Sequence, residues 1–219
     1  MSELKSNIWS LYRQMFRSRI FEEAIGKLWQ DGLMLAAIED NDPVVFLEHK
    51  LLSDNWLDYM GYGGRKTISF DVPPDGREGL VPDTPVPVAI GKGKIEITGN
   101  DVSIISLGIG VHRAKEAAEQ LKDKKINTEI IDLRTVSPLD KDLIVQSVKK
   151  TGHLIVVDED YTSFGLSGEI AAICLEAGIK FKYRRVCTDD TIPYARLLEN
   201  EMLPNVSRII HAALEVLKK

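Results

Sequence analysis

The stretch DVSIISLGIGVHRAKEAAEQLKDKKINTEIIDL, residues 101–133, decides the fold class of this chain. Residues 101–108 form a nearly continuous β-branched and apolar run, which is typical of a strand buried on both faces of a parallel sheet. Residues 127–133 return to the same pattern. Between them an apolar stripe recurs at helical spacing, at Val111, Ala114, Ala117, Ala118 and Leu121. The stretch therefore predicts a strand, a crossover helix and a second strand.

The same rhythm continues on both sides of this stretch. Residues 91–99 alternate as a half-exposed strand, residues 153–160 form another buried strand, and residues 181–188 are the last strand candidate. A helix is expected through Ile170–Ala177, ending at Gly178. The closing helix carries Val206, Ile209, Ile210, Ala213, Leu214 and Leu217. We therefore predict an α/β fold for residues 89–219, three layers α/β/α around a mainly parallel sheet.

One helix start is marked by the sequence Ser137-Pro138-Leu139-Asp140. Serine is a favoured N-cap, and proline is favoured at the first helical position because its missing N–H is not needed there. Asp140 would complete an arrangement like a capping box. The pattern thus predicts Ser137 as the N-cap.

The first third of the chain has a different character. Residues 6–31 predict one amphipathic helix whose apolar side needs a covering surface, so we expect a homodimer. Residues 33–40 continue helically, and residues 44–49 read as a short buried strand. Glycines and prolines then interrupt every pattern up to residue 88, which predicts a long linker or extended arm.

Composition limits the classes of partner. The chain has 219 residues and a formal net charge of −5, which disfavours nucleic acids and anionic membranes. Its apolar runs are too short to span a bilayer, and its first residues lack the zones of a signal peptide. Cys174 and Cys187 lie in apolar stretches, as reduced core thiols do. We expect a cytoplasmic protein with neither a nucleic-acid nor a membrane partner.

A candidate crevice is formed by Gly108, Gly110, His112 and Asp132. Two glycines between a strand and a helix, with an acid ending the next strand, mimic part of a dinucleotide-binding fingerprint. Arg113 occupies the third glycine position and breaks that fingerprint, so a tight turn explains the glycines better. A stand-alone nucleotide- or metabolite-binding module remains the alternative function.

Three acidic residues and the histidines are further candidates for catalysis or metal binding. Asp158, Glu159 and Asp160 end a predicted strand and are able to bind a cation or to pair with arginines such as Arg134. Adjacent residues of a strand point to opposite faces, so a structural role is favoured over a shared site. The histidines show no metal-ligand spacing. The residues alone therefore predict no catalytic set and no metal site.

Several segments together resemble one family. They resemble the β subunit of the thiamine-diphosphate-dependent 2-oxo acid dehydrogenases that act on pyruvate, branched-chain 2-oxo acids or acetoin, and specifically its transketolase-type carboxy-terminal domain. The match covers most of residues 34–219 and rests on DPVVFLEHK (42–50), GKGKIEITGNDVSIISLGIGVHRAKEAAEQL (91–121), INTEIIDLRTVSPLD (126–140), SVKKTGHLIVVDED (147–160), GLSGEIAA (165–172) and IPYARLLENEMLP (192–204). Residues 11–33 resemble instead the opening helix of the α subunit of the same enzymes.

The resemblance implies that the chain is divided into four segments. The parts of the family's sequence that are not found here imply a limited function. Residues 1–33 are α-subunit-like, 34–51 a remnant of the pyrimidine-binding domain, 52–88 a linker, and 89–219 the carboxy-terminal domain. The family's Gly-Asp-Gly…Asn magnesium motif and most of the pyrimidine domain are not in this sequence. We therefore expect no thiamine diphosphate or magnesium in this chain and no catalytic residue. The resemblance implies an assembly domain, inactive alone, whose partners are a thiamine-binding subunit and an acyltransferase core.

Overall fold

The computed structural model describes residues 33–47, 49, 87–193 and 195–218. The chain divides into two compact units, Met1–Ile90 and Gly91–Lys219.

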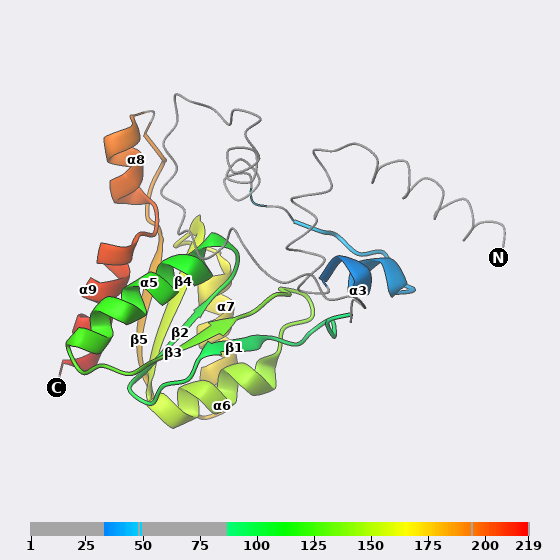
Figure 1. Cartoon of the computed structure of the whole chain (residues 1–219), viewed down its shortest axis with the longest axis horizontal. Coiled ribbons are helices and arrows are strands. Elements are labelled where there is room, and N and C mark those ends of the chain that lie inside the picture. The colour runs from blue at the N-terminus through cyan, green and yellow to red at the C-terminus, as the bar shows by residue number, and fades with distance from the viewer. Residues whose placement is uncertain (1–32, 48, 50–86, 194, 219) are drawn as a thin grey trace. The chain divides into compact units, whose positions relative to one another are not determined.

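A five-stranded sheet forms the centre of the second unit (Figure 1). Its order is β1-β3-β2-β4-β5, and only β1 is antiparallel to its neighbour. Strands β2 and β3 pair in register from Val102 opposite Thr128 to Ser106 opposite Asp132. The strands are β1 (Lys94–Ile97), β2 (Val102–Ser106), β3 (Thr128–Asp132), β4 (His153–Tyr161) and β5 (Lys182–Thr188).

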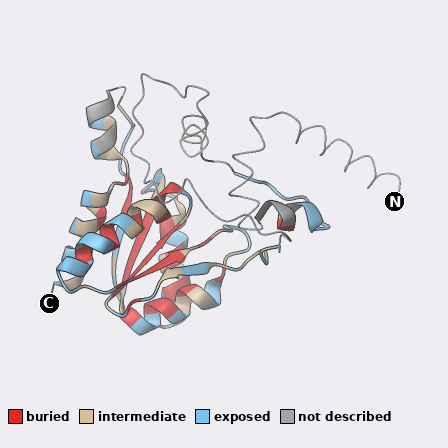
Figure 2. Ribbon diagram, in the orientation of Figure 1, coloured by how far each residue is buried: buried red, intermediate tan, exposed pale blue. Residues whose placement is uncertain are grey.

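Helices cover both faces of this sheet. The helices are α5 (Ile109–Asp123), α6 (Lys141–Thr151), α7 (Leu166–Glu176) and α9 (Val206–Leu217). Helices α5 and α9 pack on one face and α6 and α7 on the other, so the buried strands lie between them (Figure 2). Strand β4 serves both layers, because Ile155 faces α5 and α9 while Val156 faces α6 and α7.

The predicted fold class is confirmed by this architecture, a mostly parallel sheet with helices on both faces. Each strand and helix expected after residue 89 is present within a few residues of its expected bounds. The sequence patterns did not predict α8 (Arg196–Met202), because seven residues are too few to show a helical period. Among the described residues, no helix combines the length and apolar character needed to cross a membrane.

The predicted cap of α6 is wrong. The N-cap is Asp140 rather than Ser137, and the Asp140 carboxylate accepts a hydrogen bond from the backbone N–H of Leu143 at 3.2 Å. The other oxygen of this carboxylate accepts from the backbone N–H of Gly93, also at 3.2 Å. A carboxylate that bonds two elements at once is a better cap than a serine hydroxyl three residues earlier. Asp140 therefore ties β1 to the start of α6.

The first unit confirms one expectation and contradicts another. Helix α3 (Leu33–Glu39) lies where a helix was expected, but residues 44–47 and 49 do not form the predicted buried strand. Val45 is 85% exposed and Leu47 78% exposed. A strand needs neighbours for its backbone hydrogen bonds, and these residues pair with no described strand. The predicted helix at residues 6–31 and nearly all of the predicted arm lie outside the described residues.

Candidate functional site

The topology of the sheet places its switch point between β2 and β4. These strands are neighbours, yet α5 leaves β2 toward one face and α7 leaves β4 toward the other. Ligands of open α/β sheets bind at the carboxyl ends of strands at such a point. The residues around Ser106 and Val157 therefore define the candidate site.

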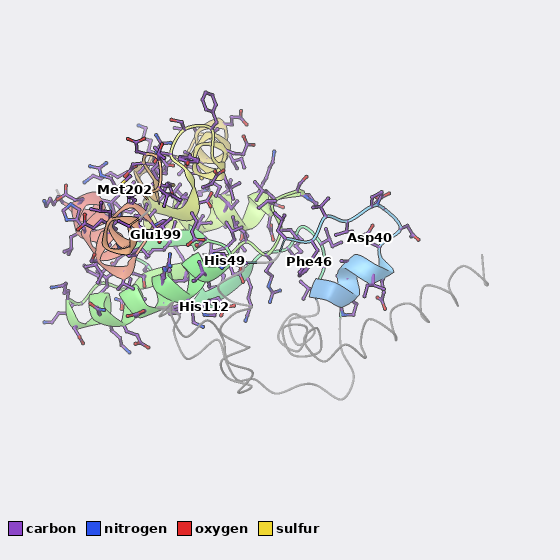
Figure 3. The ribbon with its side chains drawn as sticks, turned by 90° about the horizontal axis from the view of Figure 1, so that it is seen from above. Asp40, Phe46, His49, His112, Glu199 and Met202 are labelled. Carbon is purple, nitrogen blue, oxygen red and sulfur yellow. The ribbon has the colours of Figure 1, made fainter. Side chains whose placement is uncertain are left out.

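The predicted crevice residues gather at this edge of the sheet but not around one point. Gly108 is the N-cap of α5, and Gly110 lies in its first turn. His112 lies in the same turn and is labelled in Figure 3. Asp132 ends β3, which is on the far side of β2 from β4. One Asp132 carboxylate oxygen accepts from the backbone N–H of Arg134 at 3.0 Å. Whether these four residues bind a ligand stays a prediction.

The two glycines have separate structural explanations. Gly108 has a φ of 54°, in the left-handed region that favours glycine. A Cβ at Gly110 would overlap Ser106 Oγ and would lie 3.5 Å from Val157 Cγ1. The missing side chain therefore lets the first turn of α5 pack directly on the ends of β2 and β4. This close packing explains the glycine pair without a bound pyrophosphate.

Arg113 bridges three elements across the carboxyl end of the sheet. Its Nη1 donates to Glu159 Oε1 of β4 at 3.0 Å and to the backbone carbonyl of Pro204 at 2.5 Å. The Arg113 and Glu159 side chains are 13% and 27% exposed, so this ion pair is largely shielded from water. The residue that breaks the dinucleotide fingerprint thus holds α5, β4 and the segment between α8 and α9 together.

The three acids at the end of β4 do not converge, as expected. Glu159 faces α5 through Arg113, whereas Asp160 is exposed and accepts from the backbone N–H of Tyr161 at 2.7 Å. Burial raises the pKa of Asp158. The backbone N–H of Asp160, which donates to Asp158 at 3.1 Å, opposes that pKa shift, and the charges of Asp160 and Glu159 add to it. Glu159 therefore has a structural role, and the arginine that it pairs with is Arg113.

Both cysteines are buried and free, in agreement with the expected core thiols. Burial raises the pKa of Cys174 to about 11 and also raises that of Cys187. A thiol with a raised pKa carries little thiolate at neutral pH and is a poor nucleophile. Neither cysteine is a candidate for covalent catalysis.

A second surface feature was missed by the sequence analysis. A groove of about 470 Å³ lies between β5 and α9, lined by Arg184, Arg185, Ser207, Arg208, His211 and Glu215 among others. The available signals were the Arg184-Arg185 pair on the last strand and Arg208 and His211 at helical spacing. These residues are brought together only in the folded chain, where β5 lies beside α9.

Residues 91–209 match the family model of the transketolase C-terminal domain, over more than half of the chain. The chain belongs to this family. A solved structure described as a split gene transketolase, an inactive β4 tetramer, shares the fold with a TM-score of 0.56 at 24% identity. The match covers 64% of this chain and 48% of that one.

Two bacterial relatives are more similar in sequence to this chain than that solved structure is. The chain is 37% identical over 195 residues to the acetoin:2,6-dichlorophenolindophenol oxidoreductase subunit beta of Cupriavidus necator, covering 85% of this chain and 50% of that protein. It is 38% identical over 192 residues to the pyruvate dehydrogenase E1 component subunit beta of Rhizobium meliloti. This match covers 86% of this chain and 37% of that protein. The resemblance to β subunits of 2-oxo acid dehydrogenases is thereby confirmed. The chain spans half or less of the length of these curated relatives.

Polar groups around the switch point are bonded to other parts of the protein. Ser106 Oγ donates to the Val157 carbonyl at 2.7 Å, and Glu159 is paired with Arg113. Within the described ranges, no three His, Cys, Asp or Glu side chains cluster as metal ligands would. A magnesium ion that holds a diphosphate needs several oxygen ligands at octahedral positions. Whether the chain binds thiamine diphosphate and magnesium stays a prediction.

Proposed function

We propose that this chain is an assembly domain of the decarboxylating first component of a 2-oxo acid dehydrogenase and is inactive by itself. The observation that carries the proposal is the resemblance to β subunits over 85% of the chain. The doubly covered sheet is complete, while the sequence lacks the magnesium motif and most of the pyrimidine domain. What remains is the domain that makes contacts between subunits.

The proposal includes partners. A second polypeptide would supply the thiamine-binding domains, and the acyltransferase core of the complex would be a further partner in the cytoplasm. The apolar pattern of residues 6–31 supports a homodimer. Light scattering tests for the homodimer. A monomer at high micromolar concentration would contradict it.

Calorimetry tests the proposal for the cofactor. Thiamine diphosphate with magnesium should give no saturable heat when titrated into the purified chain. Saturable binding with a Kd below about 10 μM, roughly −7 kcal/mol, would contradict the proposal. NAD and ATP titrated in the same way test the nucleotide-binding alternative, which the packing of Gly110 and the Arg113 bridge disfavour.

A further inference from the structure

The groove between β5 and α9 concentrates positive charge in a protein whose formal net charge is −5. Arg184 and Arg185 come from β5, and Arg208 and His211 come from α9. Glu215 also lines the groove, but its carboxylate is paired with Lys218. The surface of the groove is therefore basic, although the protein as a whole is acidic.

The arginines of β5 keep most of their hydrogen-bond donors available. Arg184 Nη1 donates to the Tyr183 carbonyl at 2.9 Å, and Arg185 Nη1 donates to the Thr162 carbonyl at 2.8 Å. Both side chains are exposed, and neither forms an ion pair with a carboxylate of any described residue. A guanidinium carries five N–H donors, and its planar fork matches a carboxylate.

Arg208 has a different role in the groove. Its Nη2 donates to the Cys187 carbonyl and to Asp189, both at 2.8 Å. These bonds fix the guanidinium against the end of β5 and neutralise part of its charge. The available positive charge therefore comes mainly from the arginines of β5.

The spacing of the charges on β5 favours an extended ligand. Lys182 and Arg184 are two residues apart, and Lys182 bonds to the Lys218 carbonyl next to α9, so both lie on the α9 side of the strand. This two-residue repeat, roughly 6.6 Å, is also the spacing of alternate side chains along an extended peptide. Strand β5 is the last strand on its side of the described sheet, and its Tyr183 and Cys187 carbonyls accept hydrogen bonds from Arg184 and Arg208.

We propose that this groove binds an extended acidic peptide of a partner protein, with carboxylate side chains at alternate positions. The peptide runs along the α9 side of β5, where its carboxylates meet Lys182 and Arg184. The simpler role of such charges is to keep an edge strand from pairing with other copies, which requires no binding at all. The proposal is independent of the thiamine chemistry proposed above.

Fluorescence anisotropy with the whole chain tests the proposal. The probe is a fluorescein-labelled peptide of alternating glutamate and valine, and its control has glutamine at each glutamate. At low ionic strength the glutamate peptide should bind saturably and the glutamine peptide should not, and added salt should weaken binding. Equal binding of the two peptides, or no binding of either, overturns the proposal.

Variants locate the site. Arg184→Glu should weaken binding of the glutamate peptide about tenfold or more, and Arg184→Gln should weaken it less. Lys149→Glu makes the same change of charge at an exposed position of α6, on the other face of the sheet, and should leave binding unchanged. Far-UV circular dichroism confirms that each variant is folded. Equal weakening by Lys149→Glu overturns the proposal, and so does competition by inorganic phosphate at the concentration of the peptide, which would indicate a small-anion site.

Discussion

The two ends of the parallel strands are held together by different kinds of contact. At the amino end, the buried Glu129 of β3 accepts from Ser147 Oγ at 2.6 Å and pairs with Lys150. Ser147 in turn bonds to Ser103 of β2 at 2.6 Å, and Ser103 bonds to Thr151 at 2.8 Å. At the carboxyl end, Arg113 and Glu159 form a partly exposed pair that joins separate elements.

This difference distinguishes a network that stabilises the fold from the edge of the sheet where a ligand would be expected. Except for Lys150, whose side chain is 38% exposed, the amino-end network is enclosed, so removal of Glu129, Ser147 or Ser103 leaves a buried polar group without a partner. The carboxyl end is where ligands of such sheets bind, and here close packing at Gly110 and the Arg113 bridge occupy it. Polar contacts at both ends therefore stabilise the folded domain.

The largest expected effect is at the amino end. Glu129→Ala leaves Ser147 and Lys150 without their acceptor and should lower the free energy of unfolding by about 3 kcal/mol. The control Glu119→Ala, at an exposed position of α5, should change it by less than about 0.5 kcal/mol. Urea unfolding measures both. Similar values for the two variants would remove the distinction between the ends of the sheet.

A smaller effect is expected where α5 meets the sheet. Gly110→Ala places a methyl group against Ser106 Oγ and should destabilise the fold by about 2 kcal/mol. Gly168→Ala in α7 is the matched control, because its Cβ meets nothing within 4 Å, and it should stabilise by up to about 1 kcal/mol. Adding Ser106→Ala to Gly110→Ala should recover part of the loss. A neutral Gly110→Ala would show that the packing at this edge is looser than described.

The smallest effect concerns Asp158. Its folded-state pKa is raised mainly by burial, so the ionised carboxyl opposes folding and stability is lost as pH rises through the unfolded and then the folded pKa. Asp158→Asn removes this loss and keeps an acceptor for the Asp160 N–H. After allowance for solvent screening, the gain should be about 0.5 kcal/mol near pH 7 and smaller near pH 4, where the carboxyl of the unfolded chain is only partly ionised. Unfolding curves at the two pH values check it, and a variant that is less stable near pH 7 would reverse the sign.

The central elements of the fold were predictable because their signals are local. Ile104 and Ile105 are both fully buried on opposite faces of β2, and this double burial is what a continuous apolar run predicts. Leu121 is likewise fully buried at the helical spacing expected of α5. Such patterns depend on neighbours a few residues away.

The features that escaped prediction depend on contacts distant in sequence. Asp140 caps α6 while bonding Gly93, 47 residues away, and nothing near Ser137 signals that second bond. Arg113 was recognised as a break in a fingerprint, but its partners lie 46 and 91 residues along the chain. The basic groove likewise requires β5 and α9 to be adjacent. The strand expected at residues 44–49 failed because a pattern does not show whether a neighbouring strand exists.

The most direct test of the account is turnover by the purified chain. Pyruvate, acetoin and branched-chain 2-oxo acids are supplied with saturating thiamine diphosphate, magnesium and an artificial electron acceptor. Omission of the protein gives the blank, and a second polypeptide carrying the thiamine-binding domains is added in a parallel series. The account predicts no turnover above the blank for the chain alone, with activity only after the second polypeptide is added. Turnover by the chain alone that is abolished by a substitution in this chain would contradict it.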